Sequence, residues 1–191
     1  MKLTRREFLH LSTAAAVAGG VTLLPVGQAA ALAAPSVQQL VEEAYLYAFP
    51  LVLMDATKIV STNTETATER RAPVNQLIHV RSLMDASSRT VVSPNVDTII
   101  YTQAWLDVRA EPMLYVVPET DRFFNVQVLD GWTNTIAVLE EPGTYAIVRS
   151  GWQGTLPEGV RRVEAPTDTV WCIARIVLSG QEDLPNVYAI Q

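Results

Sequence analysis

The stretch 122–129, RFFNVQVL, decides the fold of this chain. Phe124, Val126 and Val128 alternate with polar residues along it. A period of two residues is what a strand with one buried and one solvated face requires. The stretch therefore predicts a half-buried β-strand.

Other strand-like runs lie on both sides of it, with turn signals such as Asp130-Gly131 and Glu141-Pro142-Gly143 between them. The full set of predicted strands is Thr98–Asp107, Met113–Val117, Arg122–Leu129, Thr133–Leu139, Thr144–Arg149 and Thr169–Leu178. Short strands that turns separate, with no helices between them, indicate an antiparallel sandwich or partial barrel. We expect a mainly β (α+β) fold, an antiparallel, jelly-roll-like β-sandwich.

The segment before the strands has helical periodicity. Ser36 and Gln39 fit a capping box at the start of an amphipathic helix over 37–48. Pro50 is expected to kink or break this helix, so that 51–60 forms a second helical piece. We expect both pieces to pack against the sandwich. Two segments remain, an exposed loop expected over 61–73 and a short helix expected over 181–191.

The N-terminus has the features of an export signal. The residues 4–9, TRREFL, match a twin-arginine signature, and a mildly apolar run over 11–24 leads to small residues at 29–33. An uncleaved membrane anchor is the alternative, but the run is short and ends in cleavage-type residues. We predict a signal peptide over 1–33 and a single domain over 34–191. The mature protein is then periplasmic or secreted, without stable membrane insertion.

Charge argues against a nucleic-acid partner. The leader carries Lys2, Arg5, Arg6 and Glu7, so its removal changes the formal net charge from −6 to −8. A nucleic-acid surface needs a concentrated positive footprint, and basic residues are not clustered here. We expect no nucleic-acid binding.

The mature chain has few of the histidine and cysteine residues that common catalytic and metal sites use. His10 leaves with the leader, so His79 is its only histidine, and Cys172 is the only cysteine of the whole chain. This composition excludes zinc sites made of several histidines or cysteines within the chain, and also an internal disulfide. Cys172 lies in an apolar run and is expected to be a buried, inert thiol. The sequence implies no metal and no cofactor.

Two polar groups stand beside predicted strands, SPNVD at 93–97 and DGWTN at 130–134. If the fold brings them together with His79, they form a cluster able to bind a sugar-like ligand, hold a hard cation or move a proton. The candidate proton-transfer residues are His79, Asp97 and Asp130. The candidate ligand-binding residues are Asn75, Asn95, Tyr101, Trp132 and Asn134. The alternative is that these polar residues only shape their turns and that the tryptophan packs in the core.

An ordered set of motifs resembles one known family. The motifs include Asn75-Gln76-x-x-His79, Ser93-Pro94-Asn95-x-Asp97-Thr98, Arg122-Phe123-Phe124, Leu129-Asp130-x-x-Thr133-Asn134 and Gly151-Trp152-x-Gly154. From about Val37 to its last residue, the chain resembles the family called domain of unknown function 1254. The resemblance implies a β-rich, often exported protein, usually followed by a second β domain (domain of unknown function 1214). This sequence stops where that continuation begins, so we expect a single-domain version or a truncated product, with a separate second β domain as a partner.

The sequence supports two hypotheses about function. The first is a ligand-binding or structural module of the cell envelope, which needs no catalytic group. The second is a hydrolase acting on a small or carbohydrate-like substrate, with His79 or Asp97 as the proton-transfer group. Because no motif names a reaction, the binding module is the preferred hypothesis.

Overall fold

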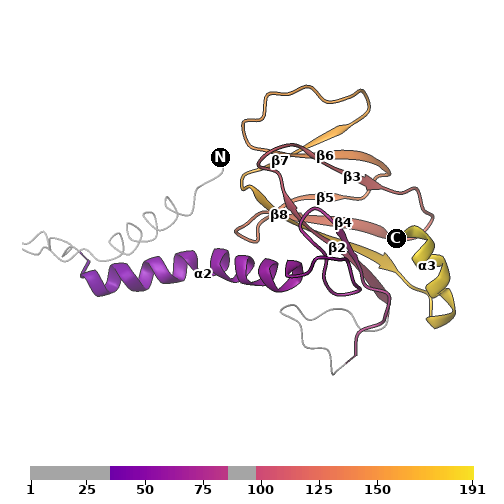
Figure 1. Ribbon diagram of the computed structural model, residues 1–191, viewed down its shortest axis with the longest axis horizontal. Helices are drawn as coiled ribbons and strands as arrows, with labels where there is room; N and C mark the ends of the chain where they lie inside the picture. The colour runs from indigo at the N-terminus through magenta and orange to yellow at the C-terminus, as the bar shows by residue number, and fades with distance from the viewer. Residues whose placement is uncertain (1–34, 86–97) are drawn as a thin grey trace, which may run out of the picture. The chain divides into compact units, whose positions relative to one another are not determined.

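The computed structural model describes residues 35–85 and 98–191 and is mainly β (Figure 1). Its strands are β1 (Leu77–His79), β2 (Ile99–Asp107), β3 (Met113–Val117), β4 (Phe124–Leu129), β5 (Thr135–Leu139), β6 (Gly143–Arg149), β7 (Arg161–Ala165) and β8 (Thr169–Val177). Its helices are α2 (Val37–Thr62), the short 3₁₀ helix η1 (Gln181–Asp183) and α3 (Leu184–Ile190). The six strands predicted from the sequence are all present, which confirms the mainly β fold.

The strands form two sheets. The first has five strands in the order β1-β2-β8-β4-β5, and all of its neighbouring pairs are antiparallel. The second has three strands in the order β3-β6-β7. Figure 1 shows the two sheets as stacked layers. Buried residues of both sheets belong to one hydrophobic cluster, as in a sandwich.

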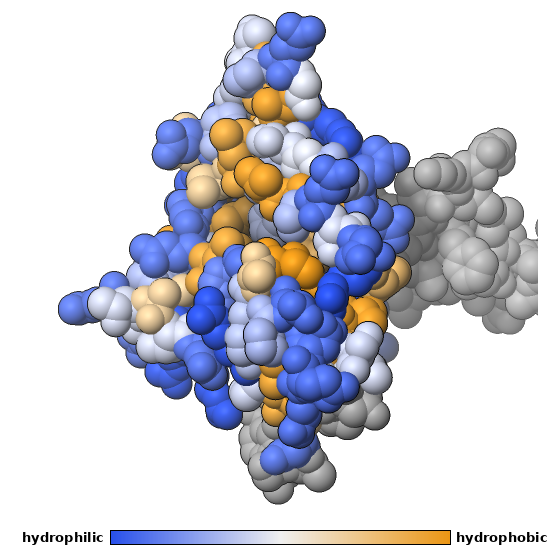
Figure 2. All heavy atoms as spheres, turned by 90° about the vertical axis from the view of Figure 1, so that its right-hand side faces the viewer, coloured by the Kyte–Doolittle hydropathy of each residue, from blue (hydrophilic) through white to orange (hydrophobic). Residues whose placement is uncertain are grey.

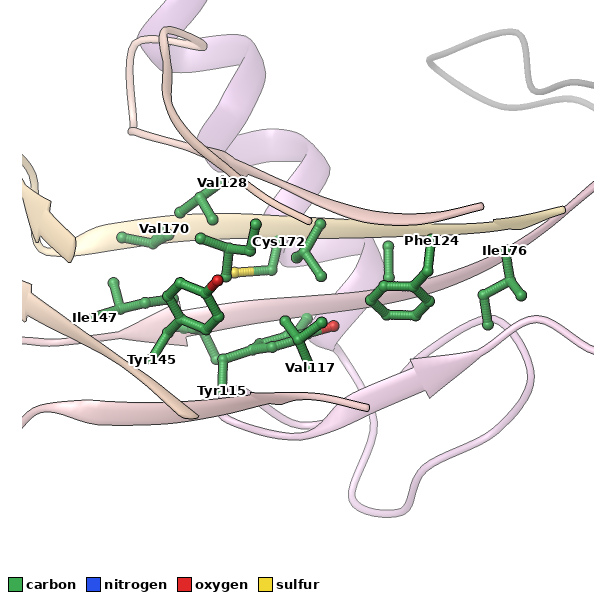
Figure 3. Packing of buried hydrophobic residues seen from close by; sticks show 14 of the residues in the cluster. Tyr115, Val117, Phe124, Val128, Tyr145, Ile147, Val170, Cys172 and Ile176 are labelled. Atoms are coloured by element: carbon green, nitrogen blue, oxygen red, sulfur yellow. The ribbon is translucent and has the colours of Figure 1, made fainter. Parts of the chain in front are cut away.

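The core lies between these layers. The residues of β4 that the alternation marks as apolar, Phe124, Val126 and Val128, are buried in it, whereas Asn125 and Gln127 are half-buried. Figure 3 shows side chains of β3 and β6, such as Tyr115 and Ile147, facing those of β4 and β8. The period-two pattern thus assigned the correct face of β4 to the core.

A second, smaller cluster covers the outer face of the five-stranded sheet. The indole rings of Trp105 and Trp171 stack there with centroids 4.8 Å apart and planes 7° apart, and Ile78, Leu129 and Ile173 surround them. Met54 of α2 belongs to this cluster and is 4% exposed. Such aromatic pairs stabilise by about 0.5–1.5 kcal/mol beyond the area that they bury.

The capping box at the start of α2 is confirmed. The backbone N–H of Gln39 donates to Ser36 Oγ at 3.2 Å, and the backbone N–H of Ser36 donates to Gln39 Oε1 at 2.8 Å. The prediction of two helical pieces was wrong, because α2 continues through Pro50. Proline removes a single N–H donor and disfavours a helix without forbidding it, so helix-forming neighbours can carry the helix across.

Fewer residues of α2 pack against the sheet than expected. Met54 is the residue of α2 that is buried, and Lys58 Nζ donates to Thr169 Oγ1 at 3.0 Å. Several large apolar side chains of the same helix are exposed, among them Tyr45, Leu46, Tyr47 and Val52.

Two strands were not predicted, and one of them makes a parallel pair. β1 has only three residues and lies at the edge of its sheet. β7 (RRVEA) lies at the edge of the second sheet and runs parallel to β6, so the sandwich is not antiparallel throughout. Charged residues are common on edge strands, where one side of the strand has no neighbour. The charged residues of β7 leave it without the alternation of apolar and polar residues from which a strand is predicted.

Candidate functional site

A cavity of about 260 Å³ opens between the sheets, beside the edge strands β1 and β3. Most of its wall is apolar and includes Leu77, Ala104, Leu106, Met113, Phe124 and Ile176. Ile190 and Gln191, at the end of α3, also line it. Figure 2 looks onto the side of the molecule that carries α3 and shows a band of apolar residues between hydrophilic ones.

The alternation of β2 explains which residues face the cavity. Thr102, Ala104 and Leu106 line it and stand at every second position of the strand, so they share one face of the strand. Thr102 lies opposite Ala174 of β8, which also lines the cavity. Two alanines on this face leave room that larger side chains would fill.

A polar network occupies one part of the wall. Gln191 Nε2 donates to Thr102 Oγ1 at 3.0 Å and lies 3.2 Å from the carbonyl oxygens of Val80 and Tyr101. Thr102 Oγ1 is also 3.1 Å from His79 Nδ1. Gln191 Oε1 is buried and has no hydrogen-bond partner among the described residues. The network therefore leaves one acceptor without a partner among these residues, at a position closed to solvent.

His79, one of the candidate proton-transfer residues, belongs to this network through its contact with Thr102. It lies on β1 opposite Thr102. Burial, and secondarily the positive charge of Arg81, lower the pKa of the imidazole below its ordinary value. The ring is therefore neutral near pH 7, and one of its nitrogens can accept a hydrogen bond or a proton.

The second polar group forms a closed turn. Asp130 is 3% exposed, and its carboxylate accepts hydrogen bonds from the backbone N–H groups of Trp132 and Asn134 and from Asn134 Nδ2, at 2.9–3.0 Å. Gly131 N–H donates to Thr167 Oγ1 at 2.7 Å. The Trp132 ring packs against Tyr47 with centroids 5.1 Å apart. These contacts match the alternative in which the polar residues shape their turn.

The structure does not bring this turn to His79. β1 and β4 are separated by β2 and β8 in the sheet. Neighbouring strands lie about 4.8 Å apart, so three spacings place β1 about 14 Å from β4 across the sheet. In addition, the strand pairing aligns His79 with Val126 of β4 across the sheet, and Asp130 follows Val126 by four residues. The common cluster expected of His79 and Asp130 does not form.

Asn75 has a positive φ of 67° and supports the edge of β2. Its backbone N–H donates to the Trp105 carbonyl at 2.8 Å, and its Oδ1 accepts from Asp107 N–H at 2.8 Å. Asn75 also lines the cavity. Tyr101 packs against the second cluster, on the opposite face of the sheet, and its carbonyl oxygen contacts Gln191 Nε2 of the network.

Asn95 and Asp97 lie outside the described residues, so their placement beside His79 stays a prediction.

Two residues of the network were missed in the sequence. Thr102 carried a usable signal, because it is the polar member of an otherwise apolar set on β2: Ile100, Thr102, Ala104 and Leu106. A polar residue at a buried position of a strand needs a partner and often marks a site. Gln191 carried no such signal, since its role depends on where α3 packs.

Other candidate chemistry within residues 35–85 and 98–191 is sparse. No three His, Cys, Asp or Glu side chains of these ranges come together as a metal site requires. Cys172 is fully buried, and burial raises the pKa of its thiol, in keeping with the predicted inert role. None of the helices in these ranges combines the length and apolar character needed to cross a bilayer.

Comparison with solved structures supports the fold. The crystal structure of the VPA0106 protein from Vibrio parahaemolyticus is similar, with a TM-score of 0.61 and 24% sequence identity. The match covers 79% of this chain and 36% of that one, so the chain spans about a third of the solved protein. At this level of sequence identity, the structural similarity is evidence for the fold alone.

No curated protein matches this chain. A family model described as "Protein of unknown function (DUF1254)" matches residues 74–191, which hold β1 to β8, the cavity and the polar network. The resemblance found in the sequence motifs is thereby confirmed, and the chain belongs to the DUF1254 family.

Proposed function

We propose that this protein is an exported ligand-binding module of the cell envelope and that the cavity beside Thr102 and Gln191 is its binding site. The observation that carries the proposal is a cavity of about 260 Å³ with a mostly apolar wall that also includes the polar residues Asn75, Gln76, Thr102 and Gln191. Ligand sites are typically apolar hollows in which a few placed polar groups orient the ligand.

The size of the cavity sets the size of the ligand. A water molecule takes about 30 Å³ of liquid, so a volume of about 260 Å³ holds on the order of nine waters. A ligand with about ten non-hydrogen atoms would fill it. The proposal is therefore a small-molecule site and not a surface for a macromolecule.

A paired substitution tests the site. Ala104 is 1% exposed and lines the cavity, so Ala104→Met places a longer apolar side chain into it. Ala56→Met makes the same change at an exposed position of α2. A thermal-shift screen of small neutral, acidic and sugar compounds should give stabilising hits on the wild type and on Ala56→Met. The same hits should be lost with Ala104→Met.

The screen also has outcomes that count against the site. Equal shifts for both variants would place binding elsewhere, and no hit at all would remove the ground for a binding module. Circular dichroism shows whether Ala104→Met keeps its fold, because overpacking of a core typically costs about 1–3 kcal/mol.

The export part of the proposal rests on the twin-arginine leader and its small-residue cleavage region. Mass spectrometry of the exported fraction should find an N-terminus near Ala31 or Ala33. Intact Met1 in a membrane pellet would contradict it.

The hydrolase alternative has one observation in its favour. His79 Nδ1 lies 3.1 Å from the hydroxyl oxygen of Thr102, which faces the cavity. A neutral imidazole beside a hydroxyl can act as a general base. If the protein is a hydrolase of this kind, it cleaves chromogenic esters or glycosides, and His79→Gln abolishes the cleavage. A wild-type rate no higher than that of the buffer would reject this candidate and leave the binding module intact.

A further inference from the structure

We infer that the face of α2 that points away from the sheet is an interface at which two copies of this chain associate. This face carries four exposed apolar side chains, which we call the outer stripe of α2: Tyr45, Phe49, Val52 and Ile59. The outer stripe is a separate surface from the proposed binding site, since none of its residues lines the cavity.

The outer stripe lies opposite the face by which α2 contacts the sheet. Met54 is buried in the cluster on the outer face of the sheet, and the Tyr47 ring packs against Trp132 with centroids 5.1 Å apart. An α-helix turns by about 100° per residue, so the outer stripe lies about half a turn around the helix from Met54. The rings of Tyr45 and Phe49 contact each other along it, with centroids 5.7 Å apart. The stripe therefore points away from the sheet.

The stripe is part of a large exposed apolar surface. Its residues and the flanking Leu46, Leu53 and Val60 are each between 43% and 71% exposed, although the outward face of a surface helix is normally polar. At roughly 150–200 Å² for each large apolar residue, these fractions amount to about 700 Å². The largest apolar patch on a typical monomer is about 300–600 Å², and a stable dimer buries about 800 Å² on each partner. The surface thus has the size of a dimer interface.

The spacing of the stripe suits a second helix with the same spacing. Its residues follow one another at intervals of four, three and seven positions, as apolar residues do along the seam of two paired helices. Side chains at these intervals fit between those of the facing helix. A second copy of the chain supplies such a helix, and most homo-oligomers are two-fold dimers that use the same patch on both copies. The stripe contains no charged side chain, so two stripes meet without repulsion between like charges.

The charges of α2 disfavour a lipid surface as the partner. Helices that lie on membranes carry Lys and Arg on their polar face, whereas α2 has the acidic Glu42, Glu43 and Asp55 against Lys58 alone. Lys58 is also engaged within the protein, because its Nζ donates to Thr169 Oγ1 at 3.0 Å. Area, spacing and charge therefore favour the same partner, a second copy of this chain.

Charge substitutions at Val52 test the interface, because Val52 is the middle residue of the stripe. Two fully overlapping stripes, whether parallel or antiparallel, place Val52 beside the partner's Val52. In the full-length protein, Val52→Glu and Val52→Lys should each raise the dissociation constant of the dimer about 30-fold or more, as the loss of a central interface residue does. An equimolar mixture of the two variants should restore the dimer, because opposite charges then face each other. Sedimentation velocity over a concentration series measures each sample.

Val138→Glu is the matched control, since Val138 of β5 is also an exposed valine. It should dimerise like the wild type. A wild-type dimer that Val52→Glu leaves intact would overturn the inference, because association then uses another surface. Two monomeric variants whose mixture stays monomeric would also overturn it, because the stripes then do not face each other.

A monomeric wild type would overturn the inference as well. If that monomer also floats with vesicles of anionic phospholipid, the outer stripe is a membrane surface. Circular dichroism verifies that the variants fold, as the exposure of Val52 leads us to expect. Phe49→Glu and Phe49→Lys, at another exposed position of the stripe, replace the Val52 pair if one of its members does not fold.

Discussion

Gln191 and Thr102 are joined by a hydrogen bond of 3.0 Å although 89 positions separate them in the sequence. The bond ties the end of α3 to the middle of β2, at the wall of the cavity. Thr102 also contacts His79 of the edge strand β1. One hydroxyl thus connects three separate parts of the chain, and its removal tests whether the fold depends on this junction.

Thr102→Val keeps the shape of the side chain and removes the hydroxyl. Because Thr102 is 5% exposed and serves two partners, we expect the free energy of unfolding to fall by about 1–2 kcal/mol. Thr135→Val is the matched control, since the Thr135 hydroxyl accepts from Gln127 at an exposed position. It should change stability by less than about 0.5 kcal/mol. Urea denaturation measures both, and equal losses would show that the junction adds nothing.

The stability should depend on pH through His79. Its pKa in the folded protein lies below the ordinary value of 6.5, so the unfolded chain binds a proton more readily. Stability should therefore be fully present well above pH 6.5 and decline as pH falls through that value. We expect the urea midpoint to drop between pH 7.5 and 5.5, and to drop less in His79→Gln. An identical pH dependence in the two proteins would contradict the assignment.

The anchoring of α3 should depend on an ion pair. Asp183 receives hydrogen bonds from Arg122 Nη1 at 2.6 Å, from Asn186 Nδ2 at 2.9 Å and from Ser179 N–H at 3.0 Å. These donors, with Arg122 first, lower the pKa of the carboxyl. The ionised Asp183 carboxyl therefore stabilises the folded protein above its unfolded-state pKa of about 4. This stabilisation is lost progressively as pH falls below that value.

Asp183→Ala should lower the urea midpoint at pH 7 more than Glu141→Ala does. Glu141 pairs with Arg161 on the surface, and exposed pairs of this kind contribute little. The difference between the two variants should shrink at pH 3, where Asp183 of the unfolded chain is largely protonated while its lowered pKa keeps it ionised in the folded protein. A difference that stays constant with pH would show that packing of the side chain, and not its charge, holds α3.

The turn at Asp130 should matter for stability and not for binding. Its carboxylate accepts three hydrogen bonds within the turn while it is almost fully buried. Asp130→Ala leaves those donors without their partner, at about 1–3 kcal/mol. The affinity for a compound that the thermal-shift screen identifies, measured by calorimetry, should stay within a factor of two of the wild type. A large loss of affinity in a folded Asp130→Ala variant would return this turn to the site.

The comparison of sequence and structure shows which signals are local. Alternation located β4, and the capping box located the start of α2, because both depend on neighbours within a few residues. β7 escaped notice because Arg161, Arg162 and Glu164 interrupt any apolar pattern, and its pairing with β6 is set by the fold. Neither strand contains the information that makes the pair parallel.

The same distinction between local and long-range information applies to the candidate site. His79 was chosen as a candidate because it is a rare residue, yet its partner Thr102 could not be named from the sequence. Asp130 was placed in the wrong cluster because the strand order β1-β2-β8-β4 separates it from His79. The cavity itself arises where the edge strands of two sheets and the end of α3 meet, and no local pattern encodes that meeting.

Methyl-detected NMR during titration with a compound that the thermal-shift screen identifies tests the central claim most directly, because the molecule contains its own control. The cavity is lined by Ala104, Leu106 and Ile176, whereas Met54, Leu129 and Ile173 belong to the cluster on the other face of the sheet. The account predicts saturable shifts of the first three methyl sets and little change in the second three. Shifts confined to the second cluster, or none at a saturating concentration of the compound, would contradict it.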